Sequence, residues 1–153
     1  MKPVPLTLRP YRAEDDLAAL VDIWDQASRR AHAFLGEARL NAQKHQLATQ
    51  WLPAAETYVA VMDDQPVGFI SLLGQTVGGL FVSPDHHRQG IGQRLIAHAL
   101  TLRGALDLDV YADNDGARRF YAAMGFQHVG HSPRDREGLP FAIIHLGLNP
   151  TAA

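Results

Sequence analysis

The chain has 153 residues, of which 46% are hydrophobic and 20% charged, and its formal net charge at pH 7 is -2. This composition is typical of one soluble globular domain over residues 1–153, and the slightly negative charge argues against a nucleic-acid-binding surface. The sequence contains no cysteine, which excludes disulfides, thiolate metal sites and a covalent cysteine intermediate. We expect a cytoplasmic protein without a membrane partner, because no apolar run approaches the ~20 residues that span a bilayer and the start MKPVPLTLRP does not resemble a signal peptide.

Two helices are predicted in the first third of the chain, after a short strand over 6–9. Apolar residues recur at helical spacing over 14–30, and a second helix is expected over 37–51. Residues 32–36 form the bend between these helices. The second helix would place three apolar residues on one face, namely Leu40, Leu47 and Trp51.

Three strand-like runs come next and should form an antiparallel meander, at 56–62, 67–73 and 77–82. The pattern then changes to helix, strand and helix, over 90–103, 106–111 and 114–124. A strand, a helix and a strand in short succession form a parallel pair with a right-handed crossover. Two more strands, at 126–130 and 141–146, complete an α/β fold with a mixed sheet of about six to seven strands and helices on both faces.

A glycine-rich corner, PDHHRQGIGQRL (84–95), precedes the helix over 90–103. Gly90 and Gly92 lack Cβ atoms, so main-chain N–H groups can approach a ligand closely. The first N–H groups of a helix have no intrahelical partner and lie at its positive end, which suits a phosphate. The Walker and Rossmann glycine patterns are not met, and a helix start without a ligand is the alternative interpretation. Three side chains can add hydrogen-bond donors, namely His87, Arg88 and Gln93.

Two segments together resemble the GNAT superfamily of N-acetyltransferases. The stretch GGLFVSPDHHRQGIGQRLIAHAL (78–100) is similar to its acetyl-CoA-binding motif, Gln/Arg-x-x-Gly-x-Gly/Ala. Gly90 and Gly92 match this motif, whereas His87 stands in the Gln/Arg place, which weakens one side-chain contact. The second signature is YADNDGARRFYAAMGF (111–126). The resemblance covers most of the chain and is closest to small, single-domain bacterial members.

The resemblance implies that acetyl-CoA is the co-substrate and that no metal is needed. It also implies that the fourth and fifth strands part at a bulge, where the pantetheine arm pairs with the fourth strand. Asn114 is expected to bond to this arm, although an N-cap role for the last helix is equally expected. The residues implied in coenzyme binding are Leu80, Phe81, Val82, His87, Arg88, Gln89, Gly90, Ile91, Gly92, Gln93, Asn114, Ala117 and Tyr121.

Two residues are predicted to be catalytic. Tyr121 would donate a proton to the departing thiolate, and the alternative is an aromatic core residue. His32 would accept a proton from the amine, since its ordinary pKa suits that task, and the alternative is a surface or helix-capping histidine. Without a cysteine, the amine would attack directly in a ternary complex. Ordered water and four other side chains are further candidates for the base, namely Glu56, Tyr58, Asp107 and Asp109.

The histidines do not predict a metal site, because His128 and His131 should face opposite sides of a strand. The acceptor is expected among the bend 30–37, the second-helix region and the loop 132–141. A small-molecule primary amine is the main expectation, on the analogy of compact bacterial relatives. The alternatives are a peptide or protein acceptor, at its N-terminus or a lysine, and a non-catalytic module that binds acetyl-CoA or another nucleotide. A homodimer is left open.

Overall fold

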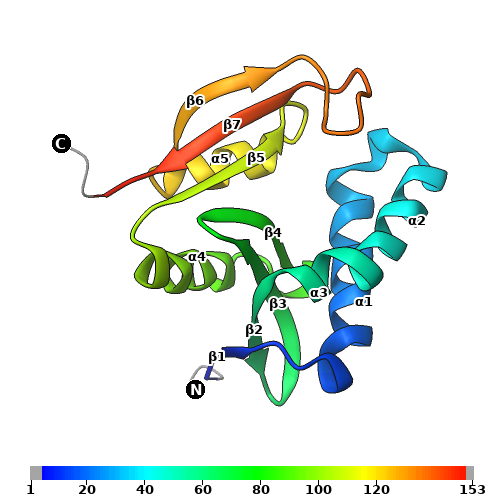
Figure 1. The fold of residues 1–153 in the computed structure, drawn as a ribbon. Helices are drawn as coiled ribbons and strands as arrows, with labels where there is room; N and C mark the ends of the chain where they lie inside the picture. Colours follow the sequence, from blue (N-terminus) through cyan, green and yellow to red (C-terminus); the bar gives the residue numbers. More distant parts are fainter. Residues whose placement is uncertain (1–4, 151–153) are drawn as a thin grey trace.

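The computed structural model describes residues 5–150 and has a seven-stranded mixed sheet at its centre (Figure 1). The sheet order is β1-β2-β3-β4-β5-β7-β6, and the β4–β5 pair is parallel. This arrangement confirms the α/β fold that the sequence predicts. The strands are β1 (Thr7–Pro10), β2 (Glu56–Met62), β3 (Gln65–Leu73), β4 (Thr76–Val82), β5 (Leu106–Tyr111), β6 (Gln127–Ser132) and β7 (Ile143–Leu148).

Helices cover both faces of the first half of the sheet and one face of the second half. Two clusters of buried side chains carry this packing, one beneath α1 and α2 and the other beneath α4 and α5. β5 alternates buried leucines with exposed Asp107 and Asp109, so the second half of the sheet has one polar face. The helices are α1 (Ala13–Ala31), η1 (Ala33–Leu35), α2 (Glu37–Gln46), η2 (Leu47–Trp51), α3 (Leu52–Ala54), η3 (Pro84–His86), α4 (Ile91–Arg103) and α5 (Asp115–Ala123).

A partly buried ion pair fixes the start of α1 against β1. The Asp16 side chain is 1% exposed, and its two oxygens accept hydrogen bonds from the Arg9 guanidinium at 2.7 and 2.8 Å. The Arg12 N–H, just before the helix, donates to the same carboxylate at 2.8 Å. The Arg9 hydrogen bond, followed by that N–H, holds the pKa of Asp16 below its ordinary value despite the opposing effect of burial.

β4 and β5 meet at one end and part at the other. Their pairing is confined to Thr76 and Asp107 within residues 5–150. The register between β3 and β4 shifts after Ser71, which leaves Gly78 as an extra residue in β4. Beyond this bulge the two strands diverge, and this confirms the splayed parallel pair that the family resemblance implies.

The second helix differs from its prediction. Its last turn, η2, is a π-helix, and the chain remains helical through Pro53 to Ala54. A π turn holds one more residue than an α turn, so the side chains after it shift around the helix axis. Leu40 and Leu47 are buried as expected, but Trp51 is 41% exposed.

The orientation of His128 and His131 was predicted wrongly. A bulge lies between His128 and Gly130, so that the extra residue Val129 restores the two histidines to one face. Their rings stack with centroids 6.1 Å apart. Simple alternation along a strand does not anticipate an inserted residue.

Candidate active site

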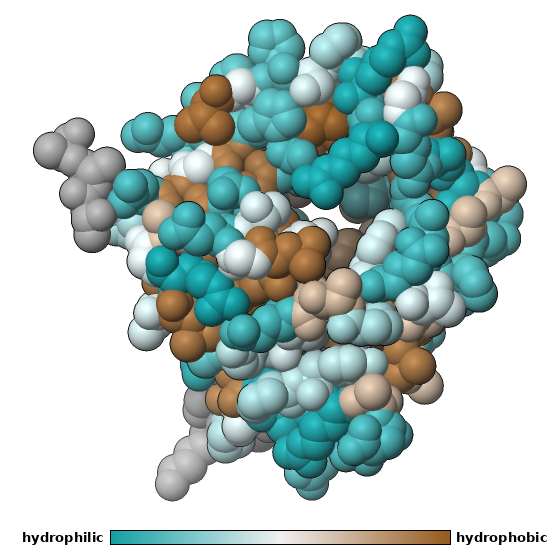
Figure 2. Space-filling model, in the orientation of Figure 1, coloured by the Kyte–Doolittle hydropathy of each residue, from teal (hydrophilic) through white to brown (hydrophobic). Residues whose placement is uncertain are grey.

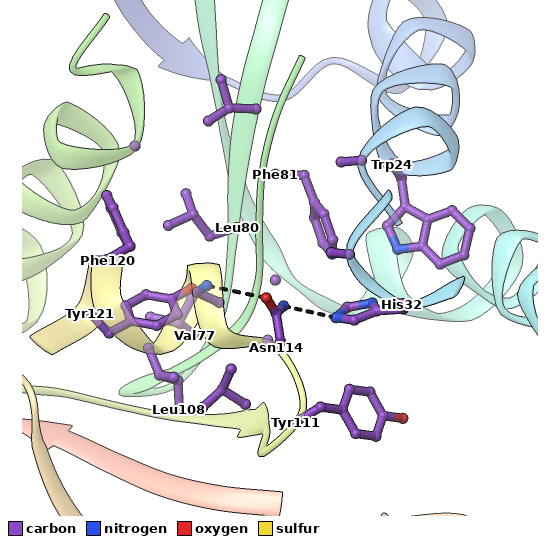
Figure 3. A pocket seen from close by; sticks show the side chains of 18 of the residues that line it. Trp24, His32, Val77, Leu80, Phe81, Leu108, Tyr111, Asn114, Phe120 and Tyr121 are labelled. Atoms are coloured by element: carbon purple, nitrogen blue, oxygen red, sulfur yellow. Dashed lines mark hydrogen bonds between the residues drawn. The ribbon is translucent and has the colours of Figure 1, made fainter. Parts of the chain in front are cut away.

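The space between the parted strands is a cavity of about 1280 Å³. It extends from the end of α1 and the π turn, across β4 and β5, to the starts of α4 and α5 and the loop after β6. Figure 2 shows an opening near the middle of the molecule with hydrophobic residues at its edge. Figure 3 shows side chains from α1, β4, β5 and α5 around this cavity. The residues that the sequence implicates in coenzyme binding, together with His32 and Asp109, all line this cavity except Gln89.

Three candidates for the base lie outside the cavity, namely Glu56, Tyr58 and Asp107. The Tyr58 hydroxyl donates to Glu56, whose carboxylate also contacts Arg103, so these two side chains are engaged on β2. Asp107 accepts a hydrogen bond from the Thr76 hydroxyl at 2.6 Å, at the closed end of the strand pair. Their positions argue against a catalytic role for any of the three.

Along β4, the main-chain N–H and C=O groups of successive residues point alternately toward β3 and toward the cavity. In an antiparallel ladder, hydrogen-bonded residue pairs alternate with pairs that are not hydrogen-bonded. Ser83 belongs to a hydrogen-bonded pair, because its N–H donates to the Val67 carbonyl at the start of β3 at 2.8 Å. Phe81, two residues back and in register with β3, has the same orientation. The main-chain groups of Leu80 and Val82 therefore point toward β5, into the gap. The prediction of three free main-chain positions is wrong for Phe81, whose main chain faces β3.

The start of α4 offers unpaired N–H groups to the cavity. Gly90 caps the helix with φ +78°, a left-handed conformation that strains residues with a side chain. Arg88 also has positive φ, at 64°, so the chain turns sharply before the helix. Within residues 5–150, no hydrogen bond engages the N–H groups of Ile91, Gly92 and Gln93. This terminus suits an anion such as a diphosphate.

Two residues of this corner, Gly92 and His87, have contacts that the sequence did not predict. A Cβ atom at Gly92 would lie 3.1 Å from the Phe120 ring, which is tighter than an ordinary contact, so packing against α5 also favours a glycine there. His87 Nε2 lies 3.1 Å from the Val82 carbonyl oxygen and ties the corner to the end of β4. The His87 ring thus holds the loop, in addition to lining the cavity.

Asn114 caps α5 and also reaches across the cavity. Its Oδ1 accepts the Ala117 N–H at 3.1 Å, as an N-cap does, so the Ala117 N–H is already engaged. Its Nδ2 lies 3.2 Å from His32 Nε2, at the other end of the site (Figure 3). The N-cap role predicted for Asn114 is confirmed by the first contact.

The surroundings of His32 do not suit a general base. Burial lowers its pKa from 6.5 to about 4, because the charged imidazolium loses its hydration. Such an imidazole has little tendency to take a proton from an alkylammonium group. The ring lies edge-on to Tyr111, with centroids 5.2 Å apart, and to Phe34 at 6.0 Å. The low pKa and these ring contacts argue against the predicted role of His32 as the base, and they describe a half-buried histidine at the end of α1.

Tyr121 is 8% exposed and projects from α5 toward the cavity (Figure 3). Its ring packs edge-on against Phe120 and Phe126, with centroids 5.2 and 5.3 Å away. Burial raises its pKa above the ordinary value, so the phenol keeps its proton at neutral pH. No hydrogen bond to another of residues 5–150 engages its hydroxyl. Tyr121 therefore has both features that the sequence analysis treated as alternatives: its ring packs in the core, and its hydroxyl can donate a proton.

Several residues that line the cavity were missed by the sequence analysis. Tyr111 donates a hydrogen bond from its hydroxyl to Asp135 at 3.2 Å, and Asp135 is 8% exposed in the loop after β6. The exposed side chains of Trp51 and Leu73 form an apolar edge on the side of the π turn. Tyr111 stands in the second signature and Asp135 in the loop 132–141 expected near the acceptor, but nothing in the sequence indicates that these two side chains meet.

No group of three or more potential ligands for a metal ion is found among the described residues. The cavity instead fits acetyl-CoA. It is long, it has unpaired N–H groups at one end for a diphosphate, and it exposes an edge of β4 main chain where an amide arm can pair.

The sequence and the fold were compared with known proteins. Residues 53–128 match the family model described as the acetyltransferase (GNAT) domain. A peptidyl-lysine N-acetyltransferase of Salmonella typhimurium, YjaB, is 41% identical over 92% of this chain and 97% of its own length. The chain belongs to the GNAT superfamily of N-acetyltransferases. This confirms the family and the acetyltransferase activity that the two signatures predict.

Solved structures of GNAT proteins share the fold over nearly the whole chain. The solution structure of apo YjaB from Escherichia coli superposes with a TM-score of 0.84 at 35% identity, covering 94% of this chain and 97% of that one. The crystal structure of the PaiA N-acetyltransferase from Thermoplasma acidophilum in complex with coenzyme A has a TM-score of 0.72 at 18% identity, over 92% and 98% of the two chains. The latter likeness concerns the fold alone. None of the helices within residues 5–150 is long and apolar enough to cross a membrane.

Proposed function

We propose that this GNAT enzyme transfers the acetyl group of acetyl-CoA to lysine side chains of proteins. The observation that carries the proposal is the likeness, over nearly the full length of both chains, to a relative named as a peptidyl-lysine N-acetyltransferase. It favours the protein acceptor, an alternative in the sequence analysis, over the small-molecule amine that was the main expectation.

The acceptor side of the cavity supports the same choice. Trp51 and Leu73 are 41% and 48% exposed at its edge, and exposed apolar side chains of this size are common at protein-binding surfaces. Tyr111 also lines the cavity and presents an aromatic wall along which the methylene groups of a lysine side chain can pack.

In this proposal the coenzyme is bound by main-chain groups. The N–H groups at the start of α4 hold the diphosphate, and those of Leu80 and Val82 orient the pantetheine arm along β4. When bound, acetyl-CoA supplies the thioester carbonyl that an amine attacks. A β4 N–H directed at the carbonyl oxygen would stabilise the charge that develops there. The role of these residues is to place the two reacting groups together in a ternary complex.

Proton transfers divide between Tyr121 and water. The Tyr121 hydroxyl keeps its proton at neutral pH and donates it to the leaving sulfur. Because His32 stays neutral and poorly basic, the ammonium group of lysine loses its proton to water in the cavity before it attacks. The reaction rate should therefore rise with pH as the fraction of neutral lysine rises, without a step near pH 4 or 6.5.

The acceptor is tested by incubating the protein with acetyl-CoA and either lysine-containing peptides or a panel of small primary amines. Free thiol release gives the rate, and mass spectrometry of the peptide locates the acetyl group. We expect kcat/KM for a lysine peptide to exceed that for the best small amine at least about tenfold, which corresponds to ~1.4 kcal/mol. Turnover of small amines alone would overturn the protein-lysine acceptor and leave the acetyltransferase activity in place.

A further inference from the structure

One hydrogen bond joins the two sides of the active-site cavity. Its partners, His32 and Asn114, are 82 residues apart in sequence, and their side-chain nitrogens Nε2 and Nδ2 are 3.2 Å apart. His32 ends α1 on the acceptor side, whereas Asn114 caps α5 on the coenzyme side. Figure 3 shows the two side chains facing each other across the cavity.

The N-cap fixes which way this hydrogen bond runs. Asn114 Oδ1 is engaged by the Ala117 N–H at 3.1 Å, so the atom that faces His32 is the amide nitrogen Nδ2. An amide NH₂ group donates and does not accept. His32 Nε2 must therefore be the acceptor, which requires a neutral imidazole with its proton on Nδ1. The low pKa of His32 agrees with this state.

The protein holds the His32 ring in this orientation. The His32 N–H donates to the Ser28 carbonyl at 2.7 Å, so its main chain closes the last turn of α1. Its ring packs edge-on against Tyr111 and Phe34, which lie on two different elements. These contacts restrict rotation of the ring, and Nε2 stays directed at Asn114.

We propose that His32 is a positioning residue, which accepts a hydrogen bond from Asn114 and thereby directs the second Nδ2–H of Asn114 into the cavity to bind an amide carbonyl of the pantetheine arm. This rests on the proposed function only in that Asn114 contacts the coenzyme. An NH₂ group has two N–H bonds in fixed planar geometry, so engaging one of them aims the other. The arrangement also couples the corner between α1 and η1 to coenzyme binding.

The state of His32 is tested first in the free protein. Nitrogen-15 NMR of the imidazole should report a single neutral tautomer from pH 5 to 9, with Nδ1 protonated and Nε2 bare. This readout needs neither coenzyme nor acceptor. An imidazole protonated on Nε2, or one that titrates near pH 6.5, would overturn the proposal.

Two substitutions then separate the hydrogen bond from packing. His32→Gln keeps an acceptor that can reach Asn114, whereas His32→Leu fills the space without one. Calorimetric titration with acetyl-CoA should show a Kd about five to ten times weaker for His32→Leu, the range expected for loss of one hydrogen bond, and within about twofold of wild type for His32→Gln. Equal affinity of His32→Leu and wild type, or no recovery in His32→Gln, would refute the positioning role.

Two further variants identify the source of any effect. Phe34→Leu disturbs the same aromatic contacts without touching the hydrogen bond, and it should change thermal stability but not the Kd for acetyl-CoA. Asn114→Asp keeps the cap acceptor and removes the donor, so it should weaken binding at least as much as His32→Leu, and adding His32→Leu to it should cause no further loss. If Asn114→Asp binds normally, the coenzyme role proposed for Asn114 is wrong, and the positioning role of His32 is refuted with it.

Discussion

Thr76 and Asp107 are the point from which the active-site cavity opens. They form the one residue pair that joins β4 to β5 within residues 5–150, and the Thr76 hydroxyl donates to the Asp107 carboxylate at 2.6 Å. The Asp107 N–H donates to the Gln75 carbonyl at 3.0 Å just before this pair. Beyond it, the Gly78 bulge turns β4 away from β5. The strand edges that open there are the surface on which the proposed coenzyme site depends.

Substitution of Gly92 should prevent coenzyme binding. A leucine there would place Cβ 3.1 Å from the Phe120 ring and would cover the N–H groups at the start of α4. We expect Gly92→Leu to abolish the thermal stabilisation by acetyl-CoA, which for the wild type is ~2.7 kcal/mol at a hundred times the Kd. Ala97→Leu is the matched control, because Ala97 is exposed on the same helix and lies outside the cavity. An undiminished thermal shift in Gly92→Leu would contradict the proposed diphosphate site.

Removal of the Tyr121 hydroxyl should slow turnover without weakening coenzyme binding. Tyr121→Phe keeps the ring contacts with Phe120 and Phe126, so the fold should be retained. Loss of a general acid lowers kcat by about 10²-fold or more. Steady-state kinetics and calorimetry on the same preparation give kcat and the Kd for acetyl-CoA. Wild-type kcat in this variant would limit Tyr121 to a packing role.

The Asp16–Arg9 pair should make stability depend on pH at the acidic end. The folded state lowers the pKa of Asp16, so the pair stabilises the protein fully above the ordinary carboxyl pKa near 4 and loses this effect as pH falls through the lower, folded-state value. Asp16→Asn leaves a half-buried guanidinium without its charged partner and should cost roughly 2 kcal/mol at pH 7. Urea unfolding of both proteins from pH 7 to pH 2 should show this difference shrinking below pH 4. A difference independent of pH would exclude ionisation of Asp16 as its cause.

The sequence predicted the elements well where local patterns decide them. β5 has the predicted bounds, 106–111, and α4 ends at the predicted residue 103. The errors come from inserted residues and from contacts across the chain. The π turn before Trp51 and the bulge at Val129 each shift side chains by one position, which periodicity cannot foresee. The chemistry of His32 depends on burial and on a partner 82 residues away, so its ordinary pKa was misleading.

Amide hydrogen exchange by NMR tests the coenzyme site most directly, because the proposed ligands are main-chain N–H groups. In the free protein, five unpaired amides should exchange fast and become protected when acetyl-CoA is added, whereas the Phe81 amide, directed at β3, should be protected throughout. Unchanged exchange at the five, or new protection confined to other elements, would contradict the account. The five amides are those of Leu80, Val82, Ile91, Gly92 and Gln93.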